Sequence, residues 1–87
     1  IRDNSIMINI NVKCFSQVKY ALGIDEFVLE LEAGTMTSEL EQNIRSKADG
    51  KLDGISLRIA VNQKYIPNDI ELNDGDEVAF IPPVQGG

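Results

Sequence analysis

Apolar and polar residues alternate strictly near the start of the chain, over residues 6–13. Alternation of this kind is typical of a strand that buries only one of its faces. The pattern returns at 27–32, and two further strand-like runs cover 57–62 and 77–81. We therefore expect four strands in these segments, with a short hairpin arm at 63–66 that continues the third.

Helical spacing replaces the alternation in two places. Residues 15–22 have a short apolar side that ends at Gly23, a residue typical of a helix stop. A longer helix is expected to begin at Thr37 or Ser38, whose hydroxyl groups would cap its first turn. Its apolar stripe is narrow, as expected for a helix that packs on a sheet, and consists of Leu40, Ile44 and Ala48.

The order of these elements is β, short α, β, α, β, short β, β. It does not follow the regular strand–helix alternation of a doubly wound fold. The pattern predicts an α+β domain at 6–81, with a mixed four- or five-stranded sheet and one main helix packed on one face. Residues 1–5 are expected to be a flexible lead-in and residues 82–87 an extended C-terminal tail.

Composition excludes several classes of function. The 87 residues allow one small domain and leave little room for a deep cleft. The chain has no histidine, which removes His-based acid–base catalysis and most transition-metal chemistry, so no metal is expected. The net charge of −6 argues against nucleic acid and anionic membranes as partners. The single cysteine fits a reducing, cytosolic setting.

Two features remain open to more than one interpretation. Cys14 would carry a persulfide only if a nearby cation or helix terminus lowered its pKa, and we favour a small residue at a strand–helix junction. The 23 residues after Lys64 contain no base. This acidic surface serves either solubility or steering towards a basic partner.

The C-terminal tail carries the strongest chemical signal. Pro82 and Pro83 end the last strand and keep the chain extended, and Gly86 would let the backbone enter a narrow passage. The carboxylate of Gly87 is then the reactive group on offer. It would need ATP and an adenylating enzyme to become an electrophile. The plain alternative is an inert C-terminus.

The segment 74–87, DGDEVAFIPPVQGG, closely resembles the C-terminus of the small-subunit family of molybdopterin synthases. Residues 15–18 and 60–63 are similar to other recurrent segments of that family, and the resemblance extends over residues 6–87. It implies a ubiquitin-like β-grasp fold, which agrees with the order of elements above.

The resemblance also implies a mechanism and its partners. An adenylyltransferase and sulfurtransferase similar to ubiquitin-activating enzymes would use ATP to convert the Gly87 carboxylate into a thiocarboxylate. The chain would bind no cofactor and would not be catalytic alone. In a heterotetramer with the large subunit, it would deliver sulfur to cyclic pyranopterin monophosphate. The expected tail-insertion residues are Gly86, Gln85, Val84, Pro83 and Pro82, and Phe80 is expected to be a core residue or a partner contact.

Three other functions fit the sequence. A related β-grasp carrier would supply sulfur for thiamine synthesis or tRNA thiolation. A ubiquitin-like protein modifier would be conjugated to lysines through Gly87. A plain interaction domain would use its tail for no chemistry at all.

Overall fold

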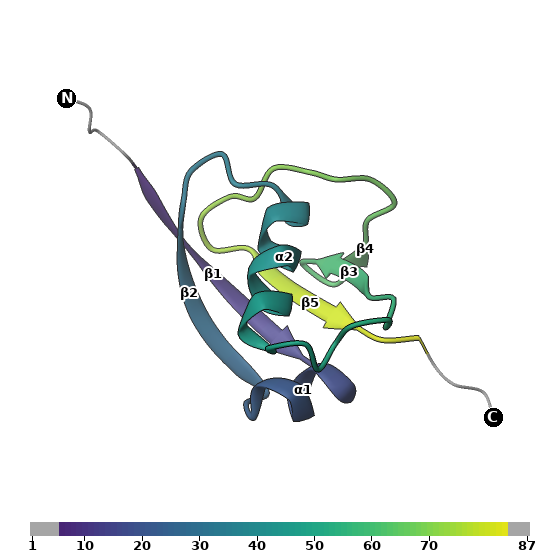
Figure 1. The fold of residues 1–87 in the computed structure, drawn as a ribbon. Coiled ribbons are helices and arrows are strands. Elements are labelled where there is room, and N and C mark those ends of the chain that lie inside the picture. Colours follow the sequence, from purple (N-terminus) through teal and green to yellow (C-terminus); the bar gives the residue numbers. More distant parts are fainter. Residues whose placement is uncertain (1–5, 84–87) are drawn as a thin grey trace.

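All strands predicted from the sequence pattern form, and they join into one five-stranded sheet (Figure 1). The computed structural model describes residues 6–83, so the expected lead-in at 1–5 and the part of the expected tail at 84–87 lie outside the described residues. The elements are, in chain order, β1 (Met7–Cys14), α1 (Gln17–Leu22), β2 (Glu26–Glu32), α2 (Thr37–Lys47), β3 (Arg58–Val61), β4 (Lys64–Tyr65) and β5 (Glu77–Ile81).

The sheet has the strand order β2-β1-β5-β3-β4. β1 and β5 are parallel neighbours at its centre, with Val12 opposite Val78. β2 pairs antiparallel with β1, and β3 pairs antiparallel with both β5 and β4. The mixed sheet with one main helix that the order of elements predicts is therefore confirmed, with five strands. The central pair joins the two halves of the chain.

The hydrophobic core lies between α2 and one face of the sheet. The predicted stripe of α2 is buried there, as are the alternate residues of β1 and β5. Burying one large aliphatic or aromatic side chain contributes about 1.5–3 kcal/mol, so this layer supplies most of the stability. Its completely buried side chains are Ile10, Val12, Val18, Leu40, Ile44, Val78 and Phe80. No helix within residues 6–83 is long and apolar enough to cross a membrane.

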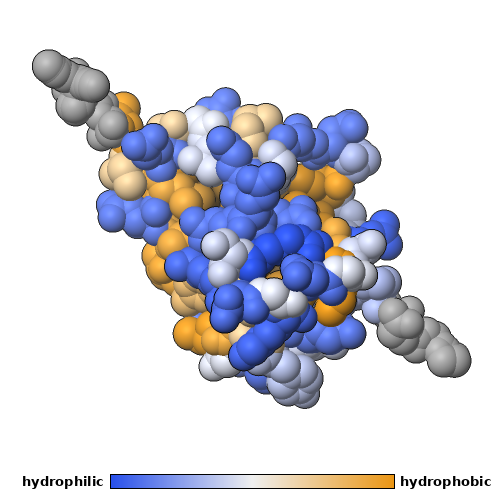
Figure 2. Space-filling view, viewed as in Figure 1, coloured by the Kyte–Doolittle hydropathy of each residue, from blue (hydrophilic) through white to orange (hydrophobic). Residues whose placement is uncertain are grey.

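Within residues 6–83 no helix covers the opposite face of the sheet, and we call it the open face (Figure 1). Figure 2 shows the side of α2, where hydrophilic residues cover the helix and hydrophobic residues reach the surface beside it. The open face points the other way, because successive side chains of a strand alternate between faces. Its half-buried or exposed strand residues are Met7, Asn9, Asn11, Lys13, Glu26, Val28, Glu30, Glu32, Arg58, Tyr65, Glu77 and Ile81.

The N-terminus of α2 differs from the prediction that Thr37 or Ser38 caps it. Thr37 is instead the first residue of the helix and Met36 is the N-cap position, while a side-chain cap on the first turn comes from Asp69 in a distant loop. The carboxylate of Asp69 accepts hydrogen bonds from the Thr37 hydroxyl at 2.6 Å, the Ser38 backbone N–H at 2.8 Å and the Ser38 hydroxyl at 2.7 Å. It thereby satisfies an N–H that has no partner inside the helix.

Replacing Thr37 by valine should destabilise the fold by about 1–3 kcal/mol, because the buried hydroxyl that links α2 to the loop at Asp69 and Ile70 is lost. The Thr37 side chain is only 1% exposed. Its hydroxyl donates to Asp69 and accepts from the backbone N–H of Ile70 at 3.1 Å, so the change leaves both groups without this partner. Urea denaturation of Thr37→Val beside the wild type measures the effect.

The matched control is Thr35→Val, since Thr35 is less buried and its hydroxyl bonds only the nearby carbonyl of Glu32.

The effect of Thr37→Val should also depend on pH. The hydrogen bonds from Thr37 and then Ser38 hold the pKa of Asp69 below its ordinary value of 3.8. A lowered carboxyl pKa stabilises the fold above the ordinary value, and that contribution disappears as the pH falls through the lowered pKa. If the difference in stability between the wild type and Thr37→Val does not narrow below pH 3.8, the lowered pKa of Asp69 is contradicted.

Candidate functional site

The tail leaves the domain from the central strand of the sheet. β5 is held between β1 and β3, and its last residue, Ile81, lies opposite Arg58. Pro82 is buried and Pro83 is exposed, so the exposed end of the described chain begins at Pro83. A strand paired on both sides gives the tail a firmly held root. The other residues predicted for tail insertion and sulfur transfer lie outside the described residues: Val84, Gln85, Gly86 and Gly87.

Phe80 requires a correction as a candidate partner contact. Its side chain is completely buried, and it lies on the side of the sheet that faces α2. Its neighbours across the strands are Cys14 and Ile59. A partner would have to open the core to reach this ring, so Phe80 is a core residue. The next residue, Ile81, lies on the open face and is only half-buried.

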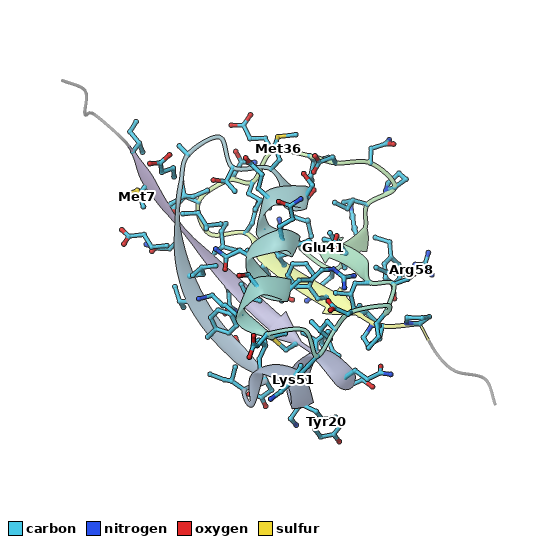
Figure 3. The ribbon with its side chains drawn as sticks, in the orientation of Figure 1. Met7, Tyr20, Met36, Glu41, Lys51 and Arg58 are labelled. Carbon is cyan, nitrogen blue, oxygen red and sulfur yellow. The ribbon has the colours of Figure 1, made fainter. Side chains whose placement is uncertain are left out.

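A group of apolar and cationic side chains surrounds the root of the tail, and we call it the root patch. It consists of Phe15, Arg58, Tyr65 and Ile81. Phe15 is 45% exposed and follows Cys14, which is paired with β5, while Tyr65 is 54% exposed on β4. Figure 3 shows Arg58 on the side of the molecule where β5 ends. The patch combines apolar area with one cation, a composition that suits a protein partner.

Charges on the open face are unevenly distributed. Near β2 the face is acidic, with Glu26, Glu30 and Glu32 on alternate positions of one strand. Lys13 forms an ion pair with Glu77, with 3.8 Å between Nζ and Oε2. The root patch therefore provides a cation at one side of the face, and β2 provides carboxylates at the other.

Cys14 is not placed for sulfur chemistry. Its side chain is 2% exposed in the core. Burial, and to a smaller extent the nearby carboxylate of Asp25, raises the pKa of the Cys14 thiol above its ordinary value. A raised pKa suppresses the thiolate, which is the reactive form. The interpretation of Cys14 as a junction residue is therefore confirmed.

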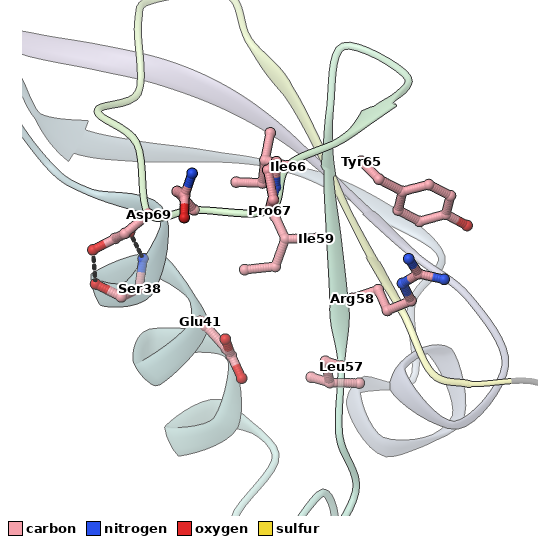
Figure 4. Close-up of a pocket in the computed structure, with 10 residues that line it drawn as sticks. Ser38, Glu41, Leu57, Arg58, Ile59, Tyr65, Ile66, Pro67 and Asp69 are labelled. Carbon is pink, nitrogen blue, oxygen red and sulfur yellow. Dashed lines mark hydrogen bonds between the residues drawn. The ribbon is translucent and has the colours of Figure 1, made fainter.

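A groove of about 500 Å³ lies between α2 and the β3–β4 arm (Figure 4). Among its polar groups, Ser38 bonds Asp69 and Glu41 bonds Arg45 at 2.9 Å, while Arg58 and Tyr65, at its edge, stack on each other. Within residues 6–83 no three acidic or sulfur side chains gather as metal ligands would. The groove thus offers no cluster of reactive groups, and the root of the tail remains the candidate site.

The sequence interpretation missed the pairing of Arg58 with Tyr65. The Cζ atom of Arg58 lies 4.5 Å from the centre of the Tyr65 ring. Asn62 and Gln63 both have positive φ, of 52° and 72°, as the two central residues of a type I′ hairpin turn do. A two-residue turn at this point fixes the register of β3 and β4 and places Tyr65 opposite Ala60, on the same face of the sheet as Arg58. Recognising that turn in the sequence would have revealed the pair.

Comparison with known proteins gives a consistent result over nearly the whole chain. The ThiS family matches residues 12–87. The molybdopterin synthase sulfur carrier subunit of Escherichia coli is 38% identical over 81 residues, which cover 90% of this chain and 99% of the relative. The protein of the same name from Chlamydomonas reinhardtii is 40% identical over 82 residues, covering 90% of this chain and 98% of the relative.

Solved structures agree with the fold. A putative molybdopterin converting factor subunit 1 from Pyrococcus furiosus superposes with a TM-score of 0.78 at 31% identity, covering 88% of this chain and 99% of the other. A complex of subunits 1 and 2 of the molybdopterin-converting factor from Helicobacter pylori gives 0.65 at 26% identity, with 92% and 100% covered. The small archaeal modifier protein 1 of Methanosarcina acetivorans gives 0.72 at 25% identity, with 94% and 99% covered. The ubiquitin-like β-grasp prediction is therefore confirmed.

Proposed function

Because this chain belongs to the ThiS family, we propose that it is the sulfur carrier subunit of a molybdopterin synthase. The observation that carries the proposal is the similarity to proteins of that name over about nine-tenths of the chain. The family match runs to Gly87, so it includes the residue on which the chemistry depends. The root of the tail supports the proposal, since β5, the strand from which the tail leaves, is paired on both sides.

The proposed reaction takes place on the Gly87 carboxylate. An adenylating enzyme transfers AMP from ATP to this carboxylate and releases pyrophosphate, which makes the carbonyl carbon electrophilic. A sulfur donor then displaces AMP and leaves a thiocarboxylate. Thioacids ionise readily, so the sulfur is nucleophilic without help from a base of this chain. The cations that hold ATP and the phosphorylated pterin would come from the partners.

The folded domain serves to orient the tail. Buried Pro82 and the pairing of Ile81 fix the direction of the chain where it leaves the sheet. At about 3.1–3.3 Å per extended residue, the six residues from Pro82 onwards reach up to roughly 19 Å. That length suits insertion into the active site of another protein. In this proposal the partners supply the catalytic groups, and the subunit is not catalytic when alone.

The root patch is the proposed docking surface for the large subunit. Its exposed apolar residues surround the point from which a tail would enter a partner, and the Helicobacter pylori relative was solved as a complex of subunits 1 and 2. The proposed assembly is a heterotetramer of two small and two large subunits. The proposed location is the cytosol, which the free thiol of Cys14 supports.

Incubation with the adenylating enzyme, ATP and a sulfur donor should replace one oxygen of Gly87 by sulfur. Intact-mass spectrometry followed by fragmentation of the C-terminal peptide measures this change. The matched control is Cys14→Ala, which removes the only thiol and should accept sulfur to the same extent. Sulfur that never reaches Gly87 would refute the proposal. Sulfur that depends on Cys14 would show that the cysteine is the carrier.

A protein modifier is the second candidate, because the similar Methanosarcina acetivorans structure is a small archaeal modifier protein. The same adenylated Gly87 would then be attacked by a lysine amine instead of sulfur. High-mass conjugates in cells would favour this function. A stable complex with the pterin-binding large subunit would favour the sulfur carrier.

A further inference from the structure

Arg58 is an exposed cation at the root of the tail. It is the first residue of β3 and lies opposite Ile81, the last residue of β5. Figure 4 shows Arg58 and Tyr65 on the side of β3 away from α2, which is the open face. The guanidinium lies over the Tyr65 ring at 4.5 Å from its centre. Arg58 therefore combines a fixed place beside the tail with an accessible charge.

The Tyr65 ring orders the guanidinium without using its hydrogen-bond donors. An arginine stacked on an aromatic face gains cation–π attraction and keeps the N–H groups of its planar edge available. In the part of the chain that the structure describes, the ion pairs are Lys13–Glu77 and Arg45–Glu41, so Arg58 has no carboxylate partner there. A held but unpaired arginine is well suited to bind a carboxylate in two parallel hydrogen bonds.

The charges around Arg58 indicate which charges the surface of a protein partner would carry. The far side of the open face carries Glu26, Glu30 and Glu32, and the lysine nearest the middle is already paired with Glu77. A complementary protein surface would be basic opposite β2 and acidic opposite Arg58. Such a pattern permits only one orientation of the two proteins, because like charges would meet in the reversed one.

We propose that Arg58, ordered by Tyr65, pairs with a carboxylate side chain of the large subunit and sets the angle at which the tail enters it. This inference rests on the proposed function, since it deepens the assignment of that partner. Arg58 is a positioning residue, because it lies at the root and not at the reacting terminus. A tilt of about 10° at the root would move a point 19 Å away by roughly 3 Å, enough to disturb a reactive geometry.

The charge reversal Arg58→Glu should weaken binding to the purified large subunit of the same organism by about 30-fold or more at low salt, because it places two carboxylates together. The matched control is Lys64→Glu, which makes the same change of charge on the neighbouring strand. Lys64 is exposed but is paired with Val61, whose side chain faces the core, so it lies off the open face. The affinity of Lys64→Glu for the large subunit should differ from that of the wild type by less than about 3-fold. Isothermal titration calorimetry measures both constants.

Two further variants test the ordering role of the ring. Tyr65→Phe keeps the ring and should bind like the wild type, whereas Tyr65→Leu should lose about 5-fold in affinity. A positioning role also predicts that Arg58→Ala lowers the rate of sulfur transfer even when the large subunit is saturating. A purely structural role would instead lower the melting temperature, and thermal unfolding of each variant checks this.

These measurements distinguish a failure of the proposed function from a failure of the inference about Arg58. If the wild type does not bind the large subunit, the proposed function fails. If the wild type binds and Arg58→Glu binds as tightly as Lys64→Glu, the proposed function stands and the inference about Arg58 fails. Restoration of Arg58→Glu by one acidic-to-lysine substitution in the large subunit would support the inference and identify the paired carboxylate.

Discussion

A variant that lacks Gly87 should fold and dock normally but deliver no sulfur, so that pterin conversion by the assembled complex falls to background. The shortened chain would end on Gln85-Gly86 and would still have a carboxylate. That carboxylate lies one residue short of the site where adenylation and transfer take place, about 3.3 Å along an extended chain. Reacting atoms must approach within about 3–3.5 Å, so a displacement of this size abolishes the reaction.

Gly87→Ala provides the matched comparison, because it keeps the length of the tail and adds only one methyl group. It should accept sulfur more slowly, since glycine lets a backbone pass through a narrow channel. Partner affinity, measured by calorimetry with the purified large subunit, should remain within about 3-fold for both variants, because the root patch supplies the contact area. Loss of binding on deletion of Gly87 would instead identify the terminus as an interface anchor.

The elements that follow from local pattern were predictable from the sequence. Alternation over 6–13 gave β1 with its buried residues Ile8, Ile10 and Val12, and the run at 77–81 gave β5 with the observed bounds. The stripe of α2 was equally clear, because a helix of 11 residues repeats its spacing several times. Local alternation predicts a strand, and helical spacing predicts a helix, wherever one side of the element is buried.

Long-range contacts were not predictable in the same way. Asp69 caps α2 from a loop more than 30 residues away, and no local pattern in the sequence links the two. The pair of Arg58 and Tyr65 depends on the register of a two-residue turn, which a shift of one residue would destroy. The tail motif itself was recognisable in the sequence. The side chains that surround its root come from different strands, so their proximity depends on the order and register of the sheet.

The two neighbours Phe80 and Ile81 should separate stability from partner binding. Phe80→Ala is expected to cost about 3–5 kcal/mol, because it removes a completely buried ring from the core. A domain of this size has a free energy of unfolding of about 4–13 kcal/mol, so the loss would remove roughly a quarter of the stability at the upper end of that range and all of it at the lower end. Urea denaturation measures the loss.

Ile81→Ala is the matched variant one position further along β5. Its side chain is half-buried on the open face, so its removal should cost less than about 1.5 kcal/mol of stability. Its affinity for the large subunit should fall about 10-fold, because it truncates the apolar contact beside Arg58. A Phe80→Ala variant that stays folded and loses only partner binding would reverse this assignment. It would mean that the core opens on docking and that the ring of Phe80 is offered to the partner.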